Sequence, residues 1–242
     1  VYCPIDAYGK FTSEVNDKEL EGLFYEQSND IVISRLEKNK SLLYKEQITH
    51  SVAIDWRTKK PIMFRATKQW FVNLEKINKD LLDAIEKVGF VNLQNKKQLI
   101  DMINNRKEWC ISRQRVWGVP LPIIYDAEQK PITDHDLINN IIEIMYKEGI
   151  NVWYEKPVEY FLTPKYLSNC QGFTKEKDIM DVWFDSGSSY NVLKTHNLSF
   201  PADLYLEGVD QYRGWFNSSL ICSVIQNKTA PYKNLISHGF TL

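Results

Sequence analysis

The chain has 242 residues, of which 30 are Lys or Arg and 31 are Asp or Glu, and 43% of its residues are apolar. A near-neutral chain with this apolar content and 13% aromatic residues is neither disordered nor collagen-like, and it is not a basic nucleic-acid-binding arm. No window approaches the roughly 18 consecutive apolar residues of a membrane-spanning helix, so we expect a soluble protein of one large domain or two small ones.

Hydrophobic periodicity predicts the elements along most of the chain. Apolar residues three or four apart favour helices, and runs of β-branched and aromatic residues favour strands. In chain order we predict loop and strand over residues 1–15, a helix from Asn29 that includes Leu42, strands over 43–52 and 61–72, and helices over 74–88, 96–109 and 134–147. Gly89 and Gly149 should end the helices before them. Residues 150–178 should form an irregular insertion.

The segment near the C-terminus has the clearest pattern. A short apolar strand over 202–208 precedes a helix over 210–227, and Pro231 separates this helix from a second strand over 234–239. A strand, a helix and a strand at this spacing predict a βαβ unit with parallel strands. The predicted fold class is therefore α/β.

The cysteines indicate the cellular compartment of the protein, and the chain ends indicate whether the sequence is part of a longer protein. Cys3, Cys110, Cys170 and Cys222 are far apart, without a Cys-x-x-Cys pair, so we expect neither a zinc site nor a disulfide framework. This favours the reducing cytoplasm, with the four thiols acting as small apolar side chains. The N-terminus has no initiator methionine or signal peptide, and the C-terminus follows a predicted strand directly. We expect both ends to be internal to a longer protein.

Polar residues and glycines gather where the two predicted parallel strands end. Ligands of such sheets bind outside the carboxyl ends of the strands, and glycine lets a ligand approach the backbone closely. Asp210 could instead cap its helix, and His238 could be a hydrogen-bonded core residue. The pattern predicts a binding site without identifying its ligand. Its candidate residues are Glu207, Gly208, Asp210, Gln211, His238 and Gly239.

Motifs in four places resemble isoleucyl-tRNA synthetases of the bacterial type. The motifs are Trp109–Pro120 (WCISRQRVWGVP), Met180–Gly187 (MDVWFDSG), Tyr205–Phe216 (YLEGVDQYRGWF) and His238–Phe240 (HGF). The first motif alone indicates only the isoleucine, valine and leucine group of class I synthetases, whereas the second and third point to isoleucine. The resemblance covers essentially the whole chain.

The resemblance implies an organisation and a reaction. Residues 179–242 would form the second half of a Rossmann-like catalytic domain, residues 61–178 a return segment with helices and loops, and residues 1–60 the C-terminal end of a β-rich editing insertion. The implied enzyme is a cytoplasmic monomer that uses ATP and Mg²⁺ to convert isoleucine to isoleucyl-adenylate and then transfers the aminoacyl group to tRNA(Ile). Such chemistry depends on positioning and charge stabilisation, and we assign no catalytic side chain and no protein ligand for a metal.

The resemblance also implies roles for individual residues. Glu207 and Gln211 would contact the aminoacyl-adenylate, Gly208 and Asp210 would shape the same pocket, and His238 and Gly239 would lie beside the adenosine. Trp183 and Trp215 would flank the isoleucine side chain, because flat apolar walls suit a branched aliphatic group. Either tryptophan could instead belong to the core.

Other readings remain open from the sequence. Arg113 and Arg115 could contact tRNA phosphate near the acceptor end, or they could belong to a structural hinge. The family's His-Ile-Gly-His and Lys-Met-Ser-Lys-Ser motifs do not occur in the chain, so we expect these 242 residues alone to be inactive, and we claim no editing activity for them. The alternatives are a valyl or leucyl relative, a non-catalytic tRNA-associated module derived from a synthetase, and an unrelated Trp-rich binding domain.

Overall fold

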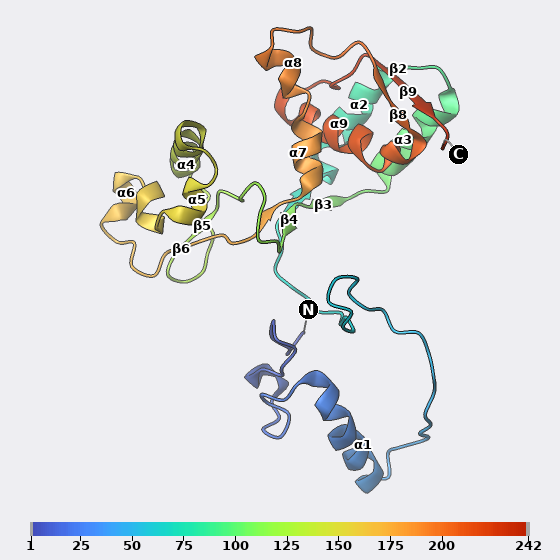
Figure 1. Ribbon diagram of the computed structural model, residues 1–242, viewed down its shortest axis with the longest axis vertical. Coiled ribbons are helices and arrows are strands. Elements are labelled where there is room, and N and C mark those ends of the chain that lie inside the picture. The colour runs from blue at the N-terminus through green and yellow to red at the C-terminus, as the bar shows by residue number, and fades with distance from the viewer. Residues whose placement is uncertain (1, 241–242) are drawn as a thin grey trace. The chain divides into compact units, whose positions relative to one another are not determined.

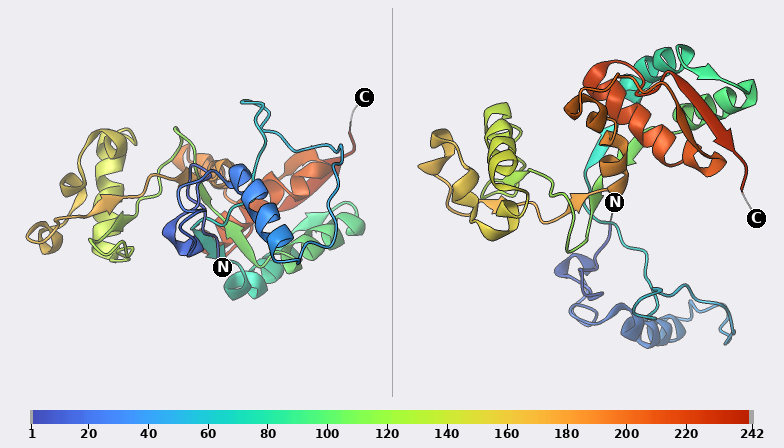
Figure 2. Two further views of the ribbon diagram at one scale, coloured as in Figure 1. Left: turned by 90° about the horizontal axis from the view of Figure 1, so that it is seen from below. Right: turned by 45° about the horizontal axis from the view of Figure 1, so that its top comes forward.

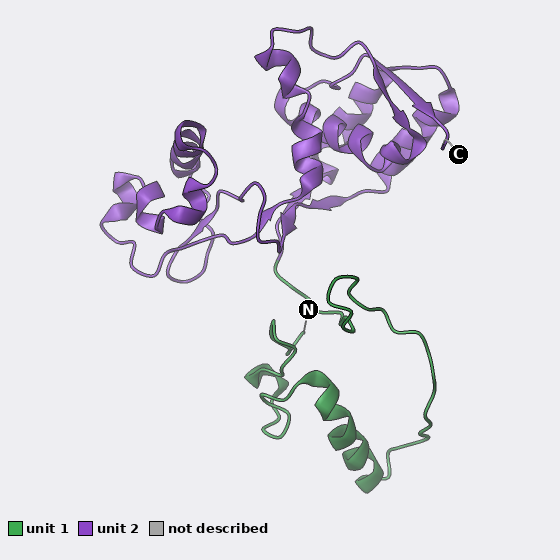
Figure 3. Ribbon diagram, in the orientation of Figure 1, with its two compact units in different colours: residues 1–68 green, residues 69–242 purple. Residues whose placement is uncertain are grey.

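The computed structural model describes residues 2–240 and divides the chain into two compact units, residues 1–68 and residues 69–242 (Figure 3). The first unit contains two short 3-10 helices and one α-helix. They are η1 (Ser13–Val15), η2 (Tyr25–Gln27) and α1 (Ser28–Lys38). The helix predicted from Asn29 is therefore present, but it begins at Ser28 and ends before Leu42. Arg35 of this helix pairs with the carboxylates of Asp17 and Glu19.

The strands predicted over residues 43–52 and 61–72 are wrong. Within residues 41–70 the structure has only an isolated bridge between Ile54 and Pro61, and the first strand, β1, spans Phe71–Asn73. Leu43 and Phe64 are 100% and 99% exposed. A run of β-prone residues forms a strand only where a partner strand covers it, and this segment has none within the described residues.

A parallel three-stranded sheet organises the second unit (Figure 1). Its strands, in sheet order, are β2 (Gly89–Phe90), β9 (Asn234–His238) and β8 (Tyr205–Gly208). The connection from β8 to β9 runs through η5 (Val209–Tyr212) and α9 (Trp215–Asn227). The predicted parallel βαβ unit is thus confirmed. Its helix begins at Trp215 rather than Asp210, because the intervening residues form a 3-10 turn.

Helices pack on one face of this sheet. They are α9, α2 (Asn78–Glu86, preceded by η3, Glu75–Ile77) and α3 (Leu93–Asn104). Tyr205 and Leu235, which are partners in the register of β8 and β9, are buried in the same core as Leu81, Leu99 and Phe216. Successive strand residues face opposite sides, so Leu206 lies on the other face, where it is 56% exposed.

Two sequence predictions for this region need correction. Gly89 does not cap α2; it begins β2, where a Cβ would lie 2.2 Å from Oδ1 of Asn234, so strand pairing itself requires glycine. Trp109 does not end a helix over 96–109, because α3 stops at Asn104. It lies in β3 (Glu108–Cys110), which pairs with β1 in antiparallel orientation. Tertiary pairing here overrides a helical spacing of apolar residues.

A smaller cluster of helices occupies residues 114–178 (Figure 2). Its elements are β5 (Ile124–Tyr125), α4 (His135–Glu148), α5 (Val152–Glu155), η4 (Val158–Phe161), α6 (Pro164–Leu167) and β6 (Thr174–Lys175). Helix α4 confirms the prediction, with Asp134 as N-cap and Gly149 after its last turn. The stretch predicted as irregular instead has short helices around its own core, in which Trp153 and Phe161 are buried against Ile141.

This cluster joins the rest of the unit through a two-stranded ribbon. Strands β4 (Ser112–Arg113) and β7 (Ile179–Met180) pair in antiparallel orientation, with Arg113 opposite Ile179. Helices α7 (Val182–Ser188) and α8 (Asn191–Thr195) follow β7. Within residues 2–240, no helix has both the length and the apolar character needed to cross a membrane.

Candidate functional site

The candidate site begins at the carboxyl ends of β8 and β9, where Gly208 lies opposite His238. A Cβ on Gly208 would lie 2.6 Å from Oδ1 of Asp210 and 3.8 Å from Cε1 of His238. The side chains of Asp210 and His238 therefore flank the same point above the backbone of Gly208. Gly208 is needed here because a Cβ would clash with the Asp210 carboxylate, and both polar side chains lie at the strand ends, where ligands of parallel sheets bind.

Gln211 extends the row away from the strand ends. Its Nε2 donates to Oδ2 of Asp210 at 3.0 Å, and its Oε1 accepts from the backbone N–H of Trp215 at 2.9 Å. These two bonds orient the Gln211 amide, with Nε2 toward Asp210 and Oε1 toward the backbone of Trp215. They also bind the 3-10 turn to the first residue of α9, which explains why the α-helix begins after the polar residues.

His238 is exposed, and its ring has one local contact. Nδ1 lies 2.7 Å from the carbonyl oxygen of Gly239, so a proton on Nδ1 satisfies this contact and leaves Nε2 as an acceptor. Gly239 is also exposed, with open space around the position of a Cβ. The two residues therefore present one ring nitrogen and an accessible backbone.

Glu207 is placed differently from the other candidates. Its register partner is Ser237, whose hydroxyl bonds Tyr212 and Asn95 on the helical side of the sheet. Since neighbouring strand residues face opposite sides, Glu207 projects to the side opposite His238. Its Oε2 accepts from the backbone N–H of Gly208 at 3.2 Å. Among residues 2–240, no side-chain hydrogen bond links the Glu207 carboxylate to the row formed by Asp210, Gln211 and His238.

The tryptophans predicted for the side-chain pocket both border this row. Trp183, on α7, is 41% exposed, and a Cβ on Gly214 would lie 2.8 Å from its Cη2 and 2.5 Å from Oε1 of Gln211. The Trp183 ring therefore lies over Gly214, beside Gln211. Glycine at this position is what allows the indole to approach the turn so closely.

Trp215 is more firmly anchored than Trp183. It stacks on Tyr205 with ring centroids 4.0 Å apart and an interplanar angle of 8°. Its Nε1 donates to the carbonyl oxygen of Ser186 and to Oγ of Ser189, both at 3.1 Å. One face of the Trp215 ring is thus covered and its polar edge is satisfied, and burial raises the pKa of the stacked Tyr205 to about 12. Trp215 can serve as a rigid wall, while Trp183 presents more free surface.

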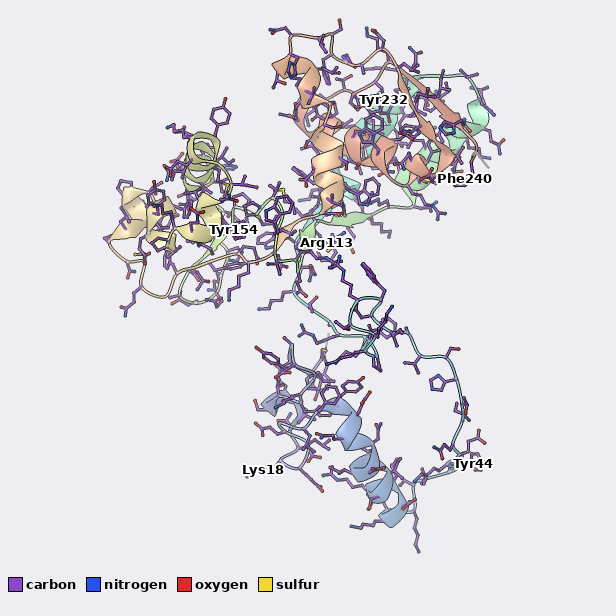
Figure 4. All side chains as sticks on the ribbon, viewed as in Figure 1. Lys18, Tyr44, Arg113, Tyr154, Tyr232 and Phe240 are labelled. Carbon is purple, nitrogen blue, oxygen red and sulfur yellow. The ribbon has the colours of Figure 1, made fainter. Side chains whose placement is uncertain are left out.

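The two predicted arginines have different surroundings. The guanidinium of Arg113 donates to the carbonyl oxygens of Cys110 and Ser112 and to Oδ2 of Asp181, all within 2.9 Å. Figure 4 labels Arg113 among the side chains of the chain. Arg115 is exposed, and it lines a cavity of about 280 Å³ that Arg113 and Asp181 also border. Burial, followed by the charge of Asp181, raises the pKa of Asp185 above its usual value. Arg113 is engaged in structural contacts, and Arg115 is open to solvent.

Sequence reasoning missed several residues that build the site. Gly214 and Tyr205 hold the two tryptophans, and Asp181 caps the helix that carries Trp183. An Asp directly before an apolar run is an N-cap signal, so Asp181 could have been noticed, whereas the stacking of Tyr205 depends on the fold. In the described part of the chain, no three side chains of His, Cys, Asp or Glu gather to hold a metal ion.

Comparison with known proteins places this chain in a family. A family model described as class I tRNA synthetases (I, L, M and V) matches residues 10–242, and the chain therefore belongs to the class I tRNA synthetases. Among curated relatives, isoleucine–tRNA ligases are similar over the whole chain. The ligase of Malacoplasma penetrans (strain HF-2) is 58% identical over 241 residues, covering 100% of this chain, and that of Ureaplasma parvum serovar 3 is 56% identical over 240 residues, covering 98%. The chain spans 27% of the length of each.

Solved structures of the class show weaker likeness. Methionyl-tRNA synthetase of Mycobacterium tuberculosis, bound by methionyl-adenylate, aligns with 80% of this chain and 30% of its own, at a TM-score of 0.45 and 14% identity. A leucyl-tRNA synthetase complex from Agrobacterium radiobacter K84 aligns with 56% of this chain and 20% of its own, at a TM-score of 0.35 and 20% identity.

Proposed function

We propose that the chain is the part of an isoleucine–tRNA ligase that carries the second half of the catalytic domain, and that the enzyme works in the cytoplasm. The observation that carries this proposal is identity of 49–58% to isoleucine–tRNA ligases along nearly the full 242 residues. The family model alone leaves the leucine, methionine and valine enzymes open. The named relatives favour isoleucine among them.

The reaction proposed has two steps. A carboxylate oxygen of isoleucine attacks the α-phosphorus of ATP and pyrophosphate leaves. A ribose hydroxyl at the 3′ end of tRNA(Ile) then attacks the carbonyl carbon of the adenylate, and AMP leaves. Neither step needs a nucleophile from the protein, so the side chains of the site have to bind, orient and stabilise charge. Mg²⁺ would neutralise phosphate charge when bound with ATP, and we assign it no ligand among residues 2–240 because no cluster of candidate ligands is present there.

Each residue of the row fits a positioning role in this reaction. The adenylate would lie against the strand ends, where Asp210 and His238 beside Gly208 would bind its polar groups. The amide of Gln211, with its orientation fixed, would bind beside Trp183. Trp183 and Trp215 would form apolar walls for the isoleucine side chain. Glu207 would reach the ligand only from the other side of the sheet edge, and Gly239 would lie beside the adenosine.

For tRNA, we propose that Arg115 rather than Arg113 meets a phosphate, because the Arg113 guanidinium is already bonded to Asp181. Arg115→Gln should then lower the salt dependence of tRNA affinity by about one phosphate contact. An unchanged salt dependence would assign the whole Ser112–Arg115 segment to the ribbon. We make no proposal that this chain edits mischarged tRNA.

Isoleucine-dependent exchange of pyrophosphate into ATP tests the activation step in the full-length protein. We expect exchange with isoleucine in preference to valine or leucine. Trp183→Ala should raise the KM for isoleucine by about tenfold or more, since a missing pocket contact of even one methylene costs about that much, and the KM for ATP should change little. Trp56→Ala, which removes an exposed tryptophan of the first unit, is the matched control. The proposal would be overturned if none of the three amino acids supported exchange.

A further inference from the structure

A buried carboxylate joins the ribbon to the helix that carries Trp183. The side chain of Asp181 is 6% exposed. Its Oδ2 accepts from Nε1 of Trp109 and from the Arg113 guanidinium, each at 2.9 Å, and its Oδ1 caps the first turn of α7 by accepting from the backbone N–H of Trp183 at 3.4 Å. Three segments of the second unit therefore converge on one acidic side chain.

The partners of Asp181 are themselves held in place. Trp109 is buried, with the guanidinium carbon of Arg106 5.1 Å from its ring centroid, and with the ring of Phe184, on α7, 6.3 Å away. Arg106 in turn donates to Oδ1 of Asn217 on α9 at 2.8 Å. The contacts around Asp181 thus reach both α7, which carries Trp183, and α9, which begins with Trp215.

The position of Trp183 follows from the start of α7. Trp183 is the second residue of this helix, and its ring lies over Gly214 beside Gln211. A small rotation of the first helical turn would move the indole away from Gly214. Removing the charge of Asp181 would leave the Arg113 guanidinium without its ion partner. It would also weaken the hydrogen bonds that Asp181 accepts from Trp109 and Arg113, which hold the carboxylate at the start of α7.

We propose that Asp181 is a positioning residue, which orients Trp183 against Gly214 and so sets the shape of the amino-acid side-chain pocket. This inference rests on the proposed function, because it takes Trp183 to be a wall of that pocket. Asp181 would act through the N-terminal turn of α7, which it caps by accepting from the backbone N–H of Trp183.

The experiment compares two capping aspartates in the full-length enzyme. Asp181→Asn should raise the KM for isoleucine by about tenfold, the order expected for a small displacement of a binding group, with the KM for ATP changed less than twofold. Asp134→Asn is the matched control. Asp134 also caps a helix, α4, and it also pairs with a cation, Lys165, at 2.6 Å, but it lies in the separate cluster of residues 114–178. We expect Asp134→Asn to leave both KM values unchanged.

A double-mutant cycle decides whether Asp181 acts through Trp183. In the Trp183→Ala background, Asp181→Asn should cause little further change in the KM for isoleucine, because the side chain that it positions is gone. Additive effects of the two substitutions, or an unchanged KM in Asp181→Asn alone, would overturn the inference. Should Asp181→Asn fail to fold, Arg113→Gln removes the ion pair but keeps the carboxylate, and the same cycle applies.

The outcome is separable from the proposed function. If the unaltered full-length protein shows no isoleucine-dependent exchange, the proposed function itself is wrong. If it shows exchange and the Asp181 variant keeps the unaltered KM for isoleucine, only the positioning role is wrong.

Discussion

At the scale of single residues, glycines decide how closely neighbouring groups approach. Gly208 lets the Asp210 carboxylate lie close to the end of β8, and Gly214 lets the Trp183 ring lie against the turn before α9. In each case a Cβ would come within 2.8 Å of a neighbouring atom, which is closer than packed atoms tolerate. The two glycines therefore contribute to the site because they have no Cβ that would push these side chains away.

Cys222 offers a test of the core at the same scale. It is buried on α9, and burial raises the pKa of its thiol to about 12, whereas an ordinary thiol has a pKa of about 8.5. Since only the thiolate is reactive, raising the pH from 7 to 9 should leave Cys222 unlabelled by iodoacetamide in the native protein. The partly exposed Cys3 and Cys170 should be labelled.

Mass spectrometry of tryptic peptides gives the extent of labelling at each cysteine. Protein unfolded in guanidinium is the control, in which all four cysteines should react. Labelling of native Cys222 at a rate similar to that of Cys170 would contradict the burial seen around α9.

At the scale of elements, α7 and α9 meet where Gly187 faces the other helix. A Cβ on Gly187 would lie 2.8 Å from the carbonyl oxygen of Ser218 and 2.9 Å from Sγ of Cys222. Gly187→Ala should therefore push the helices apart and lower the free energy of unfolding by about 1–3 kcal/mol, as overpacking does in other cores. Denaturant titration measures this change.

The control for this prediction lies on the same helix. Ser188 is partly exposed, and its hydroxyl bonds only the carbonyl oxygen of Asp185, at 3.0 Å, among the described residues. Ser188→Ala should change the stability by less than about 0.5 kcal/mol. If both substitutions changed the free energy of unfolding equally, the contact between α7 and α9 at Gly187 would not be the cause.

Elements also show what could be read from the sequence. The parallel βαβ unit was predictable because strand, helix and Pro231 follow each other within one short stretch. The failed strands over 43–52 and 61–72 have the composition of strands but lack partners, and pairing between distant segments cannot be read from a local pattern. The helix predicted over 96–109 was wrong at Trp109 because this residue pairs with β1, which lies far away in the sequence.

The positions of the candidate residues could be predicted only where they follow from the local strand order. Gly208, Asp210, Gln211 and His238 could be grouped because the ends of adjacent parallel strands meet at one edge of a sheet. The orientation of Glu207 depends on which face of β8 the helices cover, and the contacts of Arg113 depend on Asp181, which is distant in sequence. The roles of these residues in binding stay predictions.

At the scale of the whole molecule, the first unit has its least protected backbone between residues 41 and 68. This segment has no helix or regular strand in the structure, and most of its side chains are exposed. We expect limited trypsin digestion of this chain to cut first after Lys45, Lys59 or Lys68, because exposed irregular segments are preferred sites of cleavage. Mass spectrometry should then find a resistant fragment that begins near Gln69. First cuts within α2 or α3, which contain Lys79 and Lys96, would contradict this division.

The β4–β7 ribbon has a consequence for how such a chain can change in length. Arg113 and Ile179 are opposite each other in antiparallel strands, so the backbone leaves and re-enters the unit at neighbouring points. Antiparallel neighbours can be closed by a hairpin of as few as about two residues. We therefore expect that residues 114–178 can be shortened or enlarged while the chain still enters α7 along the same path, at the cost of the bonds from Trp70 to Tyr125 and Glu176.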